Sequence, residues 1–229
     1  MKYGIDKEQM KRSAPSLQRS LEITRDARFH ANSRLVARNR ASAYAVSILS
    51  TGVIFVSLLP NVFRLNHEGV QMLLACSVTL SVFIIFYSVL DSTNNYHHKS
   101  EILHTCARKV NGLLHESYSL DIKSSEHKTE LAGIWNKYHR LLEDCPINHD
   151  EVDFVSVKLN KPQLFYNYYS LRPWVKVIQR LGDRLKYYAL YHGWLLPPAI
   201  AIGILVLVVW MVVTGHVLPT PEMGREASR

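Results

Sequence analysis

Charged residues are absent from three long stretches of this 229-residue chain. The uncharged stretches are residues 41–63, 69–90 and 187–221, which are 23, 22 and 35 residues long. A helix needs only about 20 apolar residues to cross the roughly 30 Å hydrocarbon core of a bilayer. The missing charge therefore excludes a purely soluble globular fold, although the overall hydrophobic content of 48% is ordinary.

Cysteine is scarce as well, with three residues in the whole chain. Cys76, Cys106 and Cys145 show no CxxC spacing, and Cys76 lies inside an uncharged stretch. This pattern predicts neither a disulfide framework nor a zinc site. It fits loops that lie in a reducing cytosol.

Sequence motifs of catalysis are also missing, since no GxSxG, HExxH, P-loop or GxGxxG occurs. Glu101 and His104 form one E-x-x-H step, whereas a di-iron helix bundle needs two such motifs. We therefore predict no catalytic, cofactor-binding or metal-binding residues, and a protein that is not an enzyme.

Positive charge is concentrated in the first 40 residues, which carry ten basic and four acidic side chains and so hold six units of the net charge of +8. Arg34, Arg38 and Arg40 directly precede the first uncharged stretch. Basic residues beside membrane spans are kept on the cytoplasmic side, which predicts a cytoplasmic N-terminus. Anionic lipid headgroups are the nearest partner for these arginines, and we expect no direct binding of nucleic acid.

The sequence predicts an all-α membrane protein made of five segments. Pro197 and Pro198 mark the first turn of the last span, where proline is tolerated, although a re-entrant segment stays an alternative there. The predicted segments are a cytosolic basic N-terminal amphipathic helix (1–40), a transmembrane helical hairpin (41–90), a cytosolic helical region (91–196), a third transmembrane helix (197–217) and a tail (218–229).

Apolar residues repeat at helical spacing in three parts of the cytosolic region, residues 103–118, 131–142 and 174–188. Each stripe leaves one apolar face that needs a shared core or a partner. The only convincing alternation at period two is short, over residues 152–159. Tyr187, Tyr188, Tyr191 and Trp194 are typical of an aromatic belt at a membrane interface.

Small and hydroxyl-bearing residues recur at helical spacing within the first two spans. Such residues let helices approach closely and form hydrogen bonds. They indicate either packing of the hairpin within one chain or an oligomer whose hydroxyl face lines a pore, and the spacing does not separate these interpretations. The candidate pore or helix-packing residues are Ser47, Ser50, Thr51, Ser57, Ser77, Ser81 and Ser88.

A polar turn around residues 148–153 contains Asn148, His149 and Asp153. A histidine among carboxylates can act as a general base, but in a polar turn such residues more often cap a helix. We predict that these three residues form a sensing or structural cluster.

Three stretches resemble the SLATT family, the SMODS- and SLOG-associating two-transmembrane effectors of bacterial defence systems. The first is residues 27–59, an Arg- and Asn-rich helix that runs into a span. The second, residues 90–117, contains Tyr96, Leu103, His104, Cys106 and Ala107, and the third, residues 137–154, contains Tyr138, Asn148, His149 and Asp153. The resemblance covers about residues 20–155, and the helix at 174–188 and the span at 197–217 depart from it.

The resemblance implies an effector of the bacterial inner membrane that contacts lipids, forms homo-oligomers and permeabilises the membrane when triggered. In such systems the trigger partner is a nucleotide-messenger synthase or, in some branches, a reverse transcriptase. Two other functions stay open from the residues. One is a non-conducting membrane adaptor that tethers a cytosolic partner, and the other is a membrane enzyme centred on His149 and Asp153.

Overall fold

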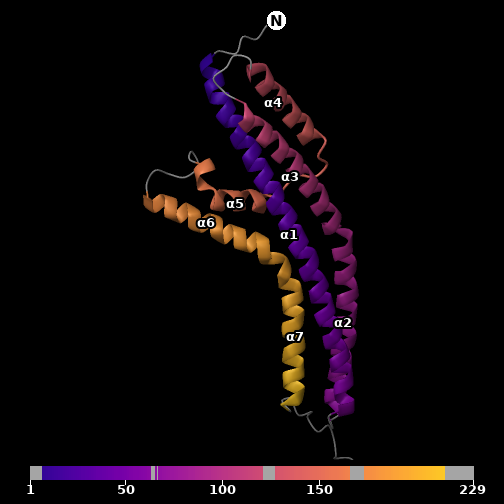
Figure 1. Ribbon diagram of the computed structural model, residues 1–229. Helices are drawn as coiled ribbons and strands as arrows, with labels where there is room; N and C mark the ends of the chain where they lie inside the picture. The colour runs from indigo at the N-terminus through magenta and orange to yellow at the C-terminus, as the bar shows by residue number, and fades with distance from the viewer. Residues whose placement is uncertain (1–6, 63–64, 66, 121–126, 166–172, 215–229) are drawn as a thin grey trace, which may run out of the picture. The chain divides into compact units, whose positions relative to one another are not determined.

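The computed structural model describes residues 7–62, 65, 67–120, 127–165 and 173–214, and the elements within these ranges are helices (Figure 1). The all-α prediction is confirmed, since the described residues contain no strand. In chain order the elements are α1 (Lys7–Val62), α2 (His67–Thr93), α3 (Tyr96–Ser119), α4 (His127–Glu143), α5 (Glu151–Asn160), the 3₁₀ turn η1 (Pro162–Phe165), α6 (Pro173–His192), the 3₁₀ turn η2 (Gly193–Leu195) and α7 (Leu196–Val213).

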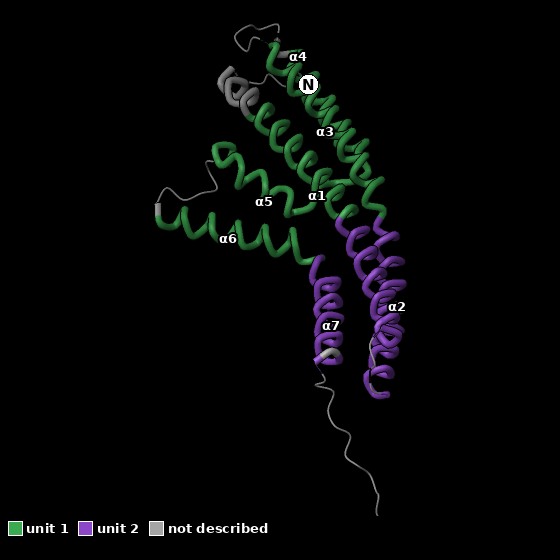
Figure 2. Tube along the Cα trace, turned by 60° about the horizontal axis from the view of Figure 1, so that its bottom comes forward, with its two compact units in different colours: residues 1–40, 95–194 green, residues 41–94, 195–229 purple. Residues whose placement is uncertain are grey.

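The chain divides into two compact units, drawn in green and purple in Figure 2. Unit 1 comprises residues 1–40 and 95–194, and unit 2 comprises residues 41–94 and 195–229. One boundary falls inside α1, whose helix is continuous from Lys7 to Val62. Another falls at Asn95, whose left-handed backbone (φ 48°) separates α2 from α3. Asparagine adopts this conformation more readily than most residues, so the break is encoded locally.

Unit 2 contains the apolar parts of the three helices that are long and apolar enough to cross a membrane. Its three helices share one core, in which Leu49 of α1 meets Leu80 of α2 and Ala201 of α7. Farther along, Val56 packs with Leu73 and Val212 in a second cluster. The hairpin and third helix therefore pack with one another inside a single chain.

The buried residues of α1 in unit 2 follow one another at steps of three, four or seven. This is the spacing of a coiled-coil seam, which keeps one face of a helix against its neighbours. The members of the seam are Ser42, Ala45, Leu49, Val56 and Leu59. Gly52 continues the seam, and a Cβ atom on it would lie 2.6 Å from Cδ2 of Leu205 on α7. The absence of a side chain at Gly52 thus allows α7 to approach α1 closely.

Pro197 and Pro198 occupy the first turn of α7, which begins at Leu196. There the missing proline N–H groups cost no helical hydrogen bond. The predicted end of that span at residue 217 and the tail 218–229 lie outside the described residues.

Unit 1 is built around the polar half of α1. Leu17 and Leu21 of α1 pack with Val110 and Leu114 of α3 and with Ile134 and Tyr138 of α4. The predicted stripes of α3 and α4 supply these contacts and are confirmed as core, except that Tyr118 is exposed and Trp135 is partly so.

Two parts of unit 1 differ from the sequence pattern. Residues 152–159, which alternate at period two, lie in helix α5 because the capping residues before them start a helix. The predicted stripe of α6 is present, but its large apolar side chains are exposed in the chain.

Candidate functional site

The first turn of α5 carries a fully buried carboxylate. Asp153 is 0% exposed, and its Oδ2 accepts a hydrogen bond from the backbone N–H of Asp150 at 3.0 Å. This contact belongs to a capping box, in which the residue at N3 satisfies the backbone at the N-cap. A buried carboxylate is costly unless charged or hydrogen-bonding groups surround it, so its partners define the site.

Arg34 of α1 supplies the opposite charge. Its Nε lies 2.8 Å from Oδ1 of Asp153, and its Nη2 lies 2.8 Å from Oδ2. The same Nη2 lies 2.6 Å from Oδ2 of Asp150. The planar guanidinium matches the two carboxylate oxygens, which makes this two-point pair strong and directional. Arg34 therefore joins α1 to the start of α5 through both carboxylates.

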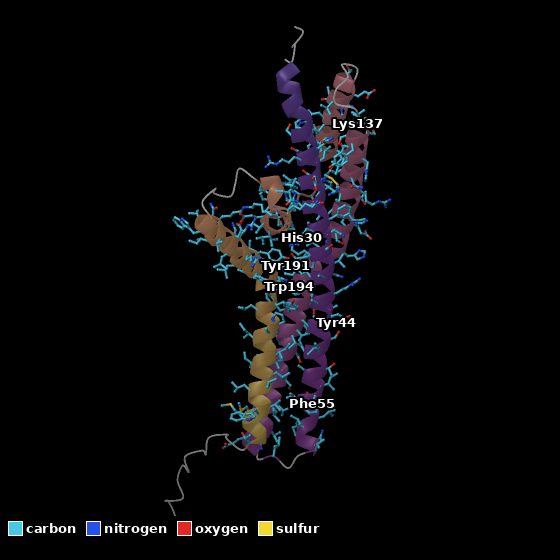
Figure 3. The ribbon with its side chains drawn as sticks, turned by 60° about the vertical axis from the view of Figure 1, so that its left-hand side comes forward. His30, Tyr44, Phe55, Lys137, Tyr191 and Trp194 are labelled. Carbon is cyan, nitrogen blue, oxygen red and sulfur yellow. A yellow bond between two sulfur atoms is a disulfide. The ribbon has the colours of Figure 1, made fainter. Side chains whose placement is uncertain are left out.

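His30, one turn before Arg34, extends the network toward α6. Its Nδ1 lies 3.2 Å from Oδ1 of Asp153, and its Nε2 lies 3.4 Å from the hydroxyl of Tyr187. The ring of Tyr191 stands edge-on at 6.4 Å between centroids, and Figure 3 labels His30 and Tyr191 in this region. We call His30, Arg34, Asp150, Asp153 and Tyr187 the Asp153 cluster.

The cluster sets the protonation of its central carboxylate. Burial by itself raises the pKa of Asp153, but hydrogen bonds from His30 and Arg34 and the charge of Arg34 outweigh burial and lower it. Asp153 is thus held as a carboxylate whose oxygens are both occupied. This geometry is suited to joining three helices and leaves no free oxygen for proton transfer.

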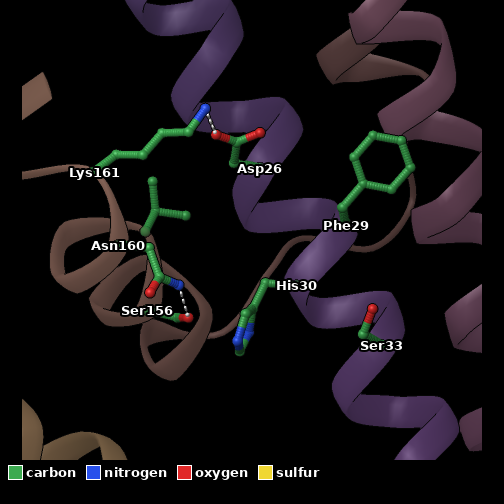
Figure 4. Close-up of a pocket in the computed structure, with 8 residues that line it drawn as sticks. Asp26, Phe29, His30, Ser33, Ser156, Asn160 and Lys161 are labelled. Atoms are coloured by element: carbon green, nitrogen blue, oxygen red, sulfur yellow. Dashed lines mark hydrogen bonds and ion pairs between the residues drawn. The ribbon is translucent and has the colours of Figure 1, made fainter.

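A cavity of about 340 Å³ lies beside the cluster and shares His30 with it (Figure 4). Helix α1 lines one side, and Ser156, Asn160 and the following residue Lys161 line the other. Lys161 is engaged by two carboxylates, Glu22 at 2.6 Å and Asp26 at 2.7 Å. Its charge is therefore already neutralised by the chain. The described residues contain no group of three or more His, Cys, Asp or Glu that could hold a metal ion.

The structure places the three residues of the predicted polar cluster differently. Asp153 is at the centre of the network. Asn148 is exposed, and its Oδ1 accepts a hydrogen bond from the backbone N–H of His149 at 3.0 Å. His149 stacks on Phe154, and burial is the main cause that lowers its pKa.

Three members of the Asp153 cluster, His30, Arg34 and Tyr187, are not predicted as a site from the sequence. His30 and Arg34 lie at i, i+4 and so share a face of α1, whereas the sequence pattern assigns only Arg34, to membrane topology. Tyr187 was assigned to an aromatic belt, whereas its hydroxyl faces His30. Nothing in the local sequence pairs these residues with Asp153.

Arg38, one turn after Arg34, lies between two aromatic rings of unit 1. Its guanidinium carbon is 4.6 Å from the ring centroid of Tyr96 and 5.4 Å from that of Trp194. Tyr96 is the first residue of α3, and Trp194 precedes α7 by two residues. The two cation–π contacts therefore join three points of the chain that lie beside the apolar segments.

The predicted hydroxyl residues do not share one environment. On α1, Ser47, Thr51 and Ser57 are exposed and donate to carbonyls four residues earlier, each at 2.9 Å, while Ser50 is half-buried. On α2, Ser77 is buried, and Ser81 and Ser88 are half-buried. The α1 row thus lies on a face that the chain leaves open, and Ser77 lies inside the chain's own packing.

One sequence prediction about cysteine is wrong. Cys106 of α3 and Cys145, which follows α4, form a disulfide with Cα atoms 6.5 Å apart. Their separation of 39 residues gave no local signal, and the packing of α3 on α4 brings them together. Nη1 of Arg28 lies 3.0 Å from the Sγ of Cys145.

Comparison with protein families gives one match, to the model described as SMODS and SLOG-associating 2TM effector domain family 5, over residues 10–204. The match extends beyond the predicted limit at residue 155 and includes α6 and the first part of α7. Comparisons with curated proteins and with solved structures give no match. The matched residues make up most of the chain, and the protein belongs to the SLATT effector domains, family 5.

Proposed function

We propose that this protein is a bacterial inner-membrane effector that assembles into oligomers and permeabilises the membrane when a partner or a messenger triggers it. Membership of a two-transmembrane effector family supports the membrane-effector part of the proposal. The observation that carries the assembly step is the open face of α1 in unit 2, where Ala43, Ser47 and Thr51 are exposed at successive turns.

A row of small residues lets a second helix approach closely, and buried hydroxyls can bond across such an interface. The chain's own helices pack on the other side of α1, through Leu49 and Val56. Because the row is not used within the chain, a second copy can dock on it without displacing α2 or α7. One hairpin encloses no channel, whereas several copies arranged around this face can.

We propose that unit 1 receives the trigger and that the Asp153 cluster keeps its helices in the resting arrangement. The ion pair of Arg34 with Asp153 holds α5 on α1, and α1 continues as one helix into the membrane segment. A partner or ligand that separates α5 from α1 would remove the contacts that α5 makes with α1, and so would change how α1 is held before it enters the membrane segment. This role is structural and assigns no catalysis to the cluster.

The proposed topology has the N-terminus and unit 1 in the cytoplasm, where the reducing environment would keep Cys106 and Cys145 as thiols. The basic residues that precede the first apolar segment, including Arg40, support this orientation. In this arrangement a nucleotide-messenger synthase or a reverse transcriptase encoded nearby can reach unit 1, and lipids contact unit 2.

The test is to express the full chain in a bacterium, with and without its neighbouring gene, while following growth and a dye that reports membrane potential. We expect depolarisation before growth arrest. Replacing Thr51 by Leu should abolish depolarisation at equal membrane abundance, because the bulkier residue keeps a second helix away. Val78→Leu is the matched control, since Val78 is also an exposed residue of a membrane helix.

Three outcomes would count against the proposal. An intact membrane potential in the presence of the trigger would favour the adaptor function. Depolarisation that survives Thr51→Leu would mean that the exposed row Ala43, Ser47 and Thr51 of α1 is not part of the oligomer interface. Loss of toxicity in a variant of half-buried His149, with depolarisation unaffected by Thr51→Leu, would favour a site at the polar turn.

A further inference from the structure

Helix α6 packs on the rest of unit 1 through its polar side. Asp183 is 8% exposed, and its Oδ1 lies 3.8 Å from Nζ of Lys158 on α5. One turn later, Nζ of Lys186 lies 2.5 Å from Oε1 of Glu151 at the start of α5. Tyr187 faces His30 on the same side. The polar face of α6 is thus the face that the rest of unit 1 covers.

The opposite face of α6 is apolar and open. Its large side chains are between 55% and 65% exposed and follow one another at steps of three and four residues, so they form one stripe. The α6 stripe consists of Trp174, Val177, Ile178, Leu181, Leu185 and Tyr188. From first to last residue it is about 21 Å long at 1.5 Å per residue. A continuous apolar surface of this kind marks a binding face, because soluble surfaces keep such patches small.

The covalent path of the chain brings this stripe to a membrane. Helix α6 ends at His192, and α7 begins at Leu196 after the short turn Gly193–Leu195. Three residues span at most about 11 Å. Because α7 is apolar throughout and is long enough to cross a bilayer, the C-terminal end of α6 lies at the surface where α7 enters.

The charge of α6 matches an anionic membrane surface. The helix carries four lysine and arginine residues, Lys176, Arg180, Arg184 and Lys186, of which Lys186 pairs with Glu151 of α5, and its one acid, Asp183, faces Lys158. Helices that lie in the membrane interface combine a basic polar side with an apolar side containing Trp and Leu. Each basic residue near an anionic leaflet adds to the attraction.

We propose that α6 is a membrane-interface helix whose α6 stripe inserts into the boundary between headgroups and acyl chains of an anionic leaflet, at the side where α7 enters. The stripe is then covered by lipid, and α5 and the Asp153 cluster are held close to the membrane surface. This inference requires only that α7 is in a membrane and does not depend on pore formation.

A photoreactive benzoylphenylalanine tests the proposal in the full chain. It replaces Leu181 on the stripe or, as a matched control, Lys176, which is exposed on the other side of the same helix. Each variant is reconstituted into vesicles of phosphatidylcholine and phosphatidylglycerol in equal parts, irradiated and analysed by mass spectrometry. We expect several-fold more lipid adduct from position 181 than from position 176, and less from position 181 in vesicles of phosphatidylcholine alone.

Other products would overturn the proposal. A cross-linked dimer from position 181 would mean that a second copy covers the stripe. The absence of any adduct would mean that the stripe faces water, and equal lipid labelling at both positions would mean that α6 has no preferred face. If the Leu181 variant does not elute like the unmodified chain in detergent, the probe at Val177, on the same stripe, gives the same test.

Discussion

Arg34 and Asp153 form a buried two-point ion pair across 119 residues of sequence, with both contacts at 2.8 Å. Asp153 lies in the first turn of α5 and accepts a hydrogen bond from the N-cap residue Asp150, and Arg34 belongs to the continuous helix that enters the apolar unit. One pair of side chains therefore couples the start of α5 to α1. The proposed trigger step depends on this coupling.

Replacing Asp153 by Asn should lower the free energy of unfolding of unit 1 by about 3 kcal/mol, because Arg34 would stay buried with only the exposed carboxylate of Asp150 as a charged partner. The measurement is thermal unfolding of the purified full chain in detergent. Glu143→Gln is the control, since Glu143 is an exposed carboxylate at the end of α4, and it should have little effect. A double variant, Arg34→Met with Asp153→Leu, should recover much of the loss, and strictly additive losses would argue against a coupled pair.

Acid should destabilise unit 1 in two steps. The pKa of His149 is lowered by burial, so the unfolded chain binds the proton more readily, and stability falls as the pH drops below the ordinary value of 6.5. The pKa of Asp153 lies below its ordinary value of 3.8. Its carboxylate therefore adds fully to the free energy of unfolding when the pH is above 3.8, and this stabilisation is lost as the pH falls from 3.8 through the lowered pKa.

The first step can be assigned by mutation. In His149→Gln the decline in melting temperature below pH 6.5 should flatten, while the decline caused by Asp153 at lower pH should stay. His98→Gln, a change at an exposed histidine of α3, should leave both steps in place. An unchanged first step in His149→Gln would show that another group causes it.

The close approach of α7 to α1 at Gly52 predicts a strong position dependence for glycine substitutions in unit 2. Gly52→Leu should lower the free energy of unfolding by about 1–3 kcal/mol, because its side chain would meet Leu205 at a place without room for it. Gly203→Leu is the matched control, since nothing lies within 4 Å of the Cβ position there. Equal melting temperatures for the two variants in the same detergent would contradict this packing.

Reduction of the Cys106–Cys145 disulfide in the purified, oxidised protein should lower the free energy of unfolding by about 4 kcal/mol, because the bond closes a loop of 39 residues. The measurement is thermal unfolding with and without dithiothreitol. Cys106→Ser should be destabilised to a similar degree and should no longer respond to the reductant. Cys76→Ser, a change at the free cysteine, should keep the full response.

Much of the fold could be predicted because it depends on local patterns. Uncharged stretches longer than a bilayer core identify the membrane segments, and Pro197 and Pro198 place the start of α7 through backbone chemistry alone. Helical spacing likewise identified the buried residues of α3 and α4, such as Val110 and Ile134. These conclusions need no knowledge of which helix packs on which.

The sequence by itself determined the helical class, the three apolar segments and the faces that each helix presents, because the period of 3.6 residues assigns side chains to faces. Only the tertiary structure decided which faces are covered. It buried Ser77 and left Thr51 open, joined Cys106 to Cys145, and turned the polar face of α6 toward α5 so that its apolar stripe stays exposed. The physical reason is that burial of a face depends on partners brought together by chain folding over long sequence distances, and a local repeat carries no record of those partners.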